Sequence, residues 1–135
     1  MGYLQSGGRI LAHDEMVTCL ESYDSILVSA GLDKVVVIWD IRAMDSTSLS
    51  RPLRKLSVDD CAILKVAIGP SAGTAAVSTL KGLYLVDFST GVSKLATPFL
   101  DGRQMRRYHD LKWNNTRNLL YAGGDDMRVD QFIFV

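Results

Sequence analysis

The sequence contains few of the residues on which most site chemistry depends. Among 135 residues there are only two cysteines and two histidines, and the cysteines lie far apart, at positions 19 and 61. Zinc sites and disulfide frameworks use clustered or regularly spaced cysteines, so neither is expected here. We predict that Cys19 and Cys61 lie in separate apolar runs as buried, reduced thiols. This usage indicates an intracellular protein, cytoplasmic or nuclear.

An excess of charge and a long apolar run are also absent. Fifteen lysines and arginines balance 15 aspartates and glutamates, so no overall field attracts nucleic acid or an anionic membrane. No apolar run approaches the roughly 18 residues of a transmembrane span, and the first residues lack the apolar core of a secretory signal. Met1, Gly2 and Ser6 formally fit an acylation pattern, although a start residue or cloning scar explains them more simply.

Residues 13–42 carry the clearest structural pattern in the chain. Three short runs rich in β-branched and aromatic residues lie there, at 17–20, 26–30 and 35–39, with turn-forming residues between them. Such runs, bounded by Gly, Asp and Ser, are typical of β-strands. The segment is therefore predicted to form a three-stranded antiparallel meander.

This segment resembles a repeat of the WD-repeat β-propeller family. The resemblance rests on a histidine near its start, a serine, a turn aspartate and a Trp-Asp pair, namely His13, Ser29, Asp33 and Trp39-Asp40. It implies that the first four of these side chains lock a blade through a buried chain of hydrogen bonds. A closed chain of this kind satisfies an indole, a hydroxyl and an imidazole at once. The role implied for the four residues is structural.

A second, degenerate repeat is expected at about residues 57–97. Strand-like runs lie at 62–68, 74–79, 83–88 and 92–95. Val77-Ser78 aligns with Val28-Ser29, and Val86 replaces Trp39. Because the histidine and the turn aspartate are missing, this blade is predicted to depend on apolar packing instead of the polar chain.

A third repeat is expected at about residues 103–135, with strands near 111–113, 119–123 and 128–134. Here Asp126 aligns with Asp33, and Phe132 aligns with Trp39. Trp39 lies 47 residues before Val86, which lies 46 residues before Phe132. A steady period of this size is the sequence signature of a radial array of blades.

The chain is thus predicted to be all-β, with antiparallel four-stranded blades of a WD-repeat propeller over residues 1–135. Residues 7–12 are expected to form the outer strand of a preceding blade, and repeat 1 to span about 13–56. About three blades make an incomplete ring, since propellers usually need about four to eight. Either the chain is the C-terminal portion of a larger propeller, or copies assemble, for example as a homodimer with six blades.

No catalytic, metal or cofactor site is expected. The adjacent His-acid pairs, His13-Asp14 and His109-Asp110, have simpler structural explanations, and two histidines with scattered thiols do not make a zinc site. The glycine pairs lack the context of a phosphate-binding loop. The sequence therefore predicts a non-enzymatic protein-interaction scaffold whose partners are other proteins.

The predicted partner surface combines exposed apolar anchors with a charged rim on the loops at one end of the blades. Its residues are Asp14, Glu15, Met16, Leu32, Arg106, Arg107, Tyr108 and Met127. An alternative function uses residues 103–108 as a basic connector that contacts RNA or a ribonucleoprotein. Its arginines, Arg103, Arg106 and Arg107, could grip phosphate bidentately.

Overall fold

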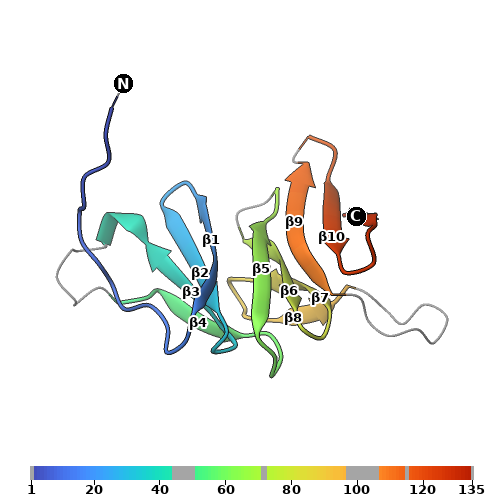
Figure 1. The fold of residues 1–135 in the computed structure, drawn as a ribbon, viewed down its shortest axis with the longest axis horizontal. Coiled ribbons are helices and arrows are strands. Elements are labelled where there is room, and N and C mark those ends of the chain that lie inside the picture. Colours follow the sequence, from blue (N-terminus) through green and yellow to red (C-terminus); the bar gives the residue numbers. More distant parts are fainter. Residues whose placement is uncertain (1, 44–50, 71–72, 97–106, 115, 135) are drawn as a thin grey trace.

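A computed structural model describes residues 2–43, 51–70, 73–96, 107–114 and 116–134. These residues form an all-β structure of antiparallel sheets, with a single short 3₁₀ helix at Ile41–Ala43 (Figure 1). Within the described residues, no helix has the length and apolar composition needed to cross a membrane.

Three sheets follow one another along the chain, and we call them blades 1, 2 and 3. Blade 1 has four strands, β1 (Val17–Tyr23), β2 (Ile26–Gly31), β3 (Val35–Asp40) and β4 (Arg54–Ser57). Blade 2 has β5 (Ile63–Ile68), β6 (Thr74–Thr79), β7 (Leu83–Asp87) and β8 (Ser93–Leu95). Blade 3 has β9 (Tyr108–Asn114), β10 (Leu119–Gly124) and β11 (Val129–Ile133). The β-branched runs in the sequence thus become strands, and neighbours in the chain pair antiparallel.

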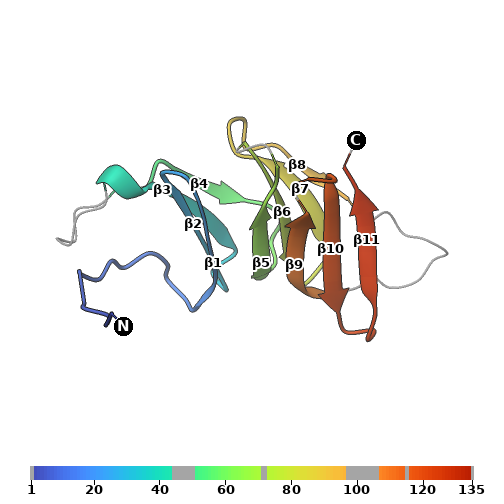
Figure 2. The ribbon, with the colours of Figure 1, turned by 90° about the horizontal axis from the view of Figure 1, so that it is seen from above.

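Blade 2 lies between the other two, and the three sheets pack face to face in chain order (Figure 2). Strands β1 and β2 contact β5, while β5 and β6 contact β9. The buried residues accordingly form two apolar clusters, one in each seam between blades. The sheets do not close into a ring.

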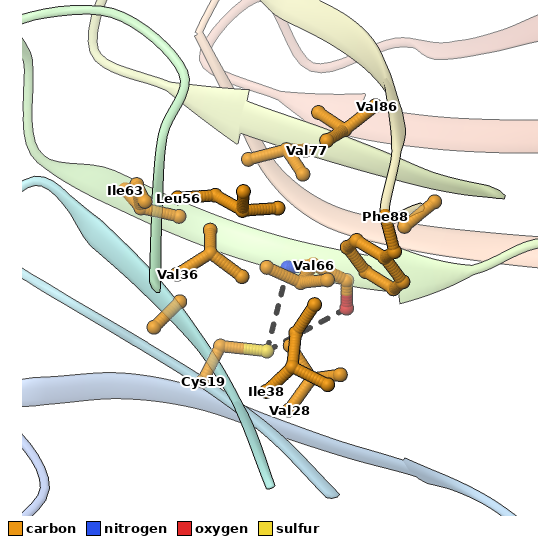
Figure 3. Packing of buried hydrophobic residues seen from close by; sticks show 12 residues of the cluster. Cys19, Val28, Val36, Ile38, Leu56, Ile63, Val66, Val77, Val86 and Phe88 are labelled. Atoms are coloured by element: carbon orange, nitrogen blue, oxygen red, sulfur yellow. Dashed lines mark hydrogen bonds between the residues drawn. The ribbon is translucent and has the colours of Figure 1, made fainter. Parts of the chain in front are cut away.

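The seam between blades 1 and 2 is tied by a cysteine (Figure 3). The Cys19 sulfur accepts a hydrogen bond from the backbone N–H of Val66 at 3.4 Å and donates one to the Val66 carbonyl at 3.6 Å. Burial raises the pKa of the Cys19 thiol, so it keeps the proton that it donates. The hydroxyl of Thr18 adds a second link, because it donates to the Ile63 carbonyl at 2.7 Å.

The seam between blades 2 and 3 uses different contacts. The indole N–H of Trp113 donates to the backbone carbonyl of Ala67 at 2.9 Å. Lys65 on β5 forms an ion pair with Asp110 on β9 at 3.7 Å. Leu83 and Leu111 are fully buried between these contacts.

Strand register corrects the predicted alignment of the first two repeats. Each first strand has a bulge near its start, and the next pair after the bulge is Cys19 with Ala30 in blade 1 and Lys65 with Ser78 in blade 2. Ser78 is therefore equivalent to Ala30, not to Ser29 as predicted. Side chains alternate between the faces of a strand, so this one-residue shift moves Ser78 to the opposite face.

The reason for the shift lies in the turn after the second strand. Five residues separate Ala30 from its partner Val36, whereas four separate Ser78 from its partner Leu83. An alignment of the repeats by residue similarity alone misses this one-residue deletion in the β6–β7 turn. Val77 occupies the position of Ser29.

The register of blade 3 agrees with the predicted alignment. Leu120 pairs with Phe132, as Leu27 pairs with Trp39. The equivalent turn residues Lys34 and Met127 both adopt positive φ, 72° and 63°. The β2–β3 and β10–β11 turns therefore share a length and a left-handed residue.

Residues 7–12 differ from the prediction, because they form no strand in this structure. A β-strand exists only beside a hydrogen-bonded neighbour. The N-terminal segment lies at the opposite end of the molecule from β11, whose outer edge carries no strand among the described residues (Figure 2).

We expect Gly124→Ala to destabilise the fold by about 1–3 kcal/mol, as overpacking does. A Cβ on Gly124 would overlap the carbonyl oxygen of Arg107, which is backbone and cannot swing aside. Gly123→Ala is the matched control, because a Cβ there meets nothing within 4 Å. Urea unfolding of both variants provides the measurement, and equal midpoints would contradict the close approach.

Candidate functional site

A chain of buried hydrogen bonds runs across the outer face of blade 1. The Trp39 indole Nε1 donates to the Ser29 hydroxyl at 3.0 Å, and that oxygen lies 2.8 Å from His13 Nε2. His13 Nδ1 lies 3.0 Å from each carboxylate oxygen of Asp33. Four segments thus meet here: β2, β3, the β2–β3 turn and the loop before β1, which contains His13.

The partners fix the direction of every hydrogen bond in this chain. A carboxylate can only accept, so His13 Nδ1 donates to Asp33. In a neutral imidazole, Nε2 then accepts from the Ser29 hydroxyl, whose oxygen is left to accept from Trp39. Each buried donor has an acceptor, as buried polar groups require.

The Asp33 carboxylate is the charged end of this chain. Burial alone raises its pKa, but hydrogen bonds from the backbone N–H of Asp14, at 3.1 Å, and from His13 outweigh burial. The pKa of Asp33 is therefore held below its ordinary 3.8. Gly31 makes room for this arrangement, since a Cβ there would lie 2.9 Å from Asp33 Oδ1 and from the Met16 carbonyl oxygen.

Serine, histidine and aspartate here stand in the order of a nucleophile, a base and an orienting acid. The side chain that would attack is inaccessible, because Ser29 is only 2% exposed and its oxygen already accepts from Trp39. The arrangement favours a structural role. Within the described residues, no group of three or more acidic, histidine or cysteine side chains could hold a metal ion.

Blade 2 contains a polar link that the sequence did not reveal. The Thr79 hydroxyl donates to Asp59 at 2.8 Å, and Asp59 also accepts the backbone N–H of Cys61 at 2.9 Å. Burial, with the nearby Asp59 carboxylate second, raises the pKa of Tyr84 to about 12. As predicted, apolar residues take the place of the buried polar chain in this blade, and Asp59 and Thr79 add a polar link between the same loop and the same strand end.

Apart from Tyr108, the predicted partner residues divide into three groups. Met16 and Met127 are 66% and 98% exposed, and Asp14, Glu15 and Arg107 are also exposed. Leu32 is half-buried, and its backbone N–H donates to the Met16 carbonyl at 3.0 Å, which places these two residues side by side. Arg106 lies outside the described residues, as do residues 103–105.

Tyr108 does not belong to this surface, contrary to the prediction. It is 3% exposed, its hydroxyl donates to Asp130 at 2.5 Å, and its ring meets Phe132 edge-on at 6.1 Å. The strand β9 begins at Tyr108 instead of after it, so the side chain enters the seam with blade 2.

Two features of the loop end were not predicted as partner sites. Leu80 in the β6–β7 turn is 42% exposed. His109, near the start of β9, is exposed and its Nε2 contacts the Asp125 carboxylate. The sequence signal that could have identified Leu80 as a partner residue was its apolar side chain in the short turn between Thr79 and Gly82.

With this geometry established, comparison with known proteins is informative. Residues 5–40 match the family model described as "WD domain, G-beta repeat". This part of the chain is thus similar to a WD repeat. The matched range ends at Asp40 and includes all four members of the buried chain, so it covers β1, β2 and β3 of blade 1 but not β4. A search of curated proteins finds no match.

The three blades together have the fold of part of a WD-repeat propeller. The chain is similar to the crystal structure of the WD40 domain from Toxoplasma gondii coronin, with a TM-score of 0.73 and 20% sequence identity. The match covers 92% of this chain and 32% of that one. The chain therefore spans about a third of the coronin chain that it matches.

Two serine-to-alanine substitutions should differ in their effect on stability. Ser29→Ala leaves the buried Trp39 indole without an acceptor and should cost about 1–3 kcal/mol. The Ser78 hydroxyl is buried and has no hydrogen-bond partner in the described part of the chain, and Ala30 occupies the equivalent position in blade 1. Ser78→Ala should therefore be neutral or stabilise the protein by about 1 kcal/mol. Denaturant midpoints measure both, and a loss of stability in Ser78→Ala would contradict the corrected register.

Acid should weaken the WD repeat through Asp33. Its folded pKa lies below 3.8, so its contribution to stability is complete above about pH 3.8 and is lost as the pH falls further. Asp33→Asn should lower stability at neutral pH and make it less dependent on pH in this acidic range. Unfolding curves from about pH 5 to pH 2 test this, and equal pH slopes for the two proteins would contradict it.

Proposed function

We propose that the chain acts as a non-enzymatic protein-interaction scaffold, with a partner bound across the turns at one end of its blades. The β2–β3, β6–β7 and β10–β11 turns connect equivalent strands, so they lie at the same end of each blade (Figure 1). Each turn carries an apolar side chain that is at least partly exposed: Leu32, Leu80 and Met127. This repeated placement is the observation that supports the proposal.

The chemistry of this turn surface suits a protein partner. Methionine side chains adapt to varied apolar surfaces, and Met16 beside Leu32 forms an apolar pair on blade 1. Charged groups surround the apolar residues, including Asp14, Glu15 and the ion pair of Lys81 with Asp60 at 3.8 Å. An apolar centre with a polar rim is the common plan of protein interfaces.

Two further features support the proposal. The buried state of Ser29 and the structural use of His13 leave the one nucleophile-base-acid arrangement in the described residues inaccessible. Cys19 and Cys61 are both free thiols, which is consistent with a reducing, intracellular compartment. We further propose that additional blades complete the ring, supplied by a longer chain or by a second copy.

A paired substitution tests the turn surface. Met16→Glu combined with Met127→Glu places charges at two of the proposed anchors without touching a buried group, so partner capture should fall at least about tenfold while stability stays unchanged. Leu20→Glu is the control, because Leu20 is 60% exposed on β1, away from the turns. Quantitative affinity capture from cell extract compares the three proteins.

Undiminished capture of the same proteins by the double variant would contradict the proposal that the turn surface binds a partner. A steep loss of captured RNA with added salt would instead favour the basic connector at residues 103–108, of which the structure describes Arg107 and Tyr108.

A further inference from the structure

The outer strand of blade 1 carries a short basic run that the proposed turn surface does not use. With one residue on either side, the strand reads Leu53-Arg54-Lys55-Leu56-Ser57-Val58. Ser57 thus follows an arginine by three positions and a lysine by two, and an apolar residue comes next. Among the arginines of the chain, only Arg54 stands three residues before a serine or threonine. Basic-directed protein kinases recognise this pattern, because acidic groups in their clefts bind the cations that precede the acceptor.

Strand β4 places Ser57 where an enzyme reaches it. β4 is the last strand of its sheet, so in the described part of the chain one of its edges is unpaired (Figure 1). Ser57 is the final residue of this strand and is exposed, whereas Leu56 is buried in the first apolar cluster. Alternate residues share a face of a strand. Ser57 and Lys55 therefore both point away from the seam between blades 1 and 2.

Further blades would leave this strand edge open. The principal contacts between blades are made by strands far from the edge, namely β1 and β2 with β5, and β5 and β6 with β9. A blade that packs on the other face of blade 1 would use the same inner strands. The outer edge of β4 therefore stays at the surface of the molecule, and the site is compatible with the completed ring proposed above.

The two basic side chains are not equally available in the folded strand. Lys55 is exposed. The Arg54 guanidinium donates to the backbone carbonyls of Phe88, at 2.7 Å, and Ser89 in blade 2. Arg54 and Ser57 also lie on opposite faces of β4, because an odd number of positions separates them. A kinase cleft that binds both residues therefore needs β4 to separate from β3.

Separation of β4 is a local event. The strand is held by its pairing with β3, by the burial of Leu56 and by the two hydrogen bonds of Arg54. Segments with few buried groups open at a lower free energy than the whole domain. Leu56 is the one buried side chain of the strand, so its contacts control how often the strand opens.

We propose that Ser57 is the phosphate acceptor of a basic-directed serine/threonine kinase, and that the opening of β4 controls its modification. The Ser57 Oγ attacks the γ-phosphorus of ATP, the bond from that phosphorus to the β–γ bridging oxygen breaks, and ADP leaves. The hydroxyl proton passes to the catalytic aspartate of the kinase.

The phosphate would lie at the margin of the turn surface. It adds a charge of about −1.5 to −2 at neutral pH, two residues before Asp59 and three before Asp60. It therefore makes this corner more acidic and changes the charge that a partner meets there. The modification itself does not rest on the proposed turn surface, because it is measured without a partner.

Phosphorylation of the purified chain by the catalytic subunit of cAMP-dependent protein kinase, with ATP, tests the proposal. Mass spectrometry should show one added phosphate and place it on Ser57, and Ser57→Ala should stay unmodified. Lys55→Ala should lower the initial rate roughly tenfold, because it removes a charged contact with the kinase. Lys112→Ala is the matched control, since this lysine is exposed on β9, and its rate should equal that of the wild type.

Leu56→Ala tests the opening of the strand. Loss of the buried side chain should make β4 open more often and raise the rate at least roughly tenfold. A blocked peptide of residues 51–60 has the same motif without the sheet. It should be phosphorylated faster than the folded chain, and its rate should be the same with leucine or alanine at position 56.

Four results would overturn the proposal. The first is a chain that stays unmodified while the peptide is phosphorylated, and the second is an unchanged rate in Lys55→Ala. Both apply even if Leu56→Ala fails to fold. The third is an unchanged rate in a folded Leu56→Ala. The fourth is faster modification by casein kinase II that Asp60→Asn abolishes, which would assign Ser57 to a kinase that recognises acids after the acceptor.

Discussion

The fold depends on covering both faces of each sheet. Blade 2 achieves this within the chain, because Val66 and Val77 are buried toward blade 1 while Ala67 and Leu83 are buried toward blade 3. In the described part of the chain, blades 1 and 3 each have a neighbouring sheet on one face only. The hydrophobic stabilisation is proportional to the apolar area removed from water. The outer faces of blades 1 and 3 therefore need another means of stabilisation or another partner. In blade 1 that means is the buried chain from Trp39 to Asp33, which satisfies its polar groups locally and needs no adjoining blade to do so.

Blade 1 has polar side chains, and blade 2 apolar ones, at equivalent positions. Ser29 and Trp39 carry the hydrogen-bonded chain on blade 1, and Val77 and Val86 fill the same places on blade 2. On blade 2 this face is fully covered by blade 1, so branched aliphatic side chains suffice. The link from Asp59 to Thr79 then does what His13 and Asp33 do, holding the loop before the first strand to the end of the second.

The sequence predicted the strands well because β-branched runs and turn residues are local signals, and the strands near 26–30, 74–79 and 119–123 lie where the pattern placed them. It failed where the outcome depends on a non-local partner. The one-residue deletion in the β6–β7 turn changed which face Ser78 occupies, and only pairing with Lys65 reveals this. The sequence predicted Tyr108 to be a connector residue, but the packing of blade 3 on blade 2 buries it.

The two seams are joined by different chemistry, a thiol on a peptide group in the first and a lysine with an aspartate in the second. Cys19, Lys65 and Asp110 occupy equivalent positions on the first strands of blades 1, 2 and 3. Asp110 pairs with Gly123 within blade 3, as Cys19 pairs with Ala30 and Lys65 with Ser78. The repeats are therefore not interchangeable modules. Exchanging two repeats would remove the Cys19 link to Val66 or the Lys65–Asp110 ion pair, so the contacts within each seam depend on the order of the blades.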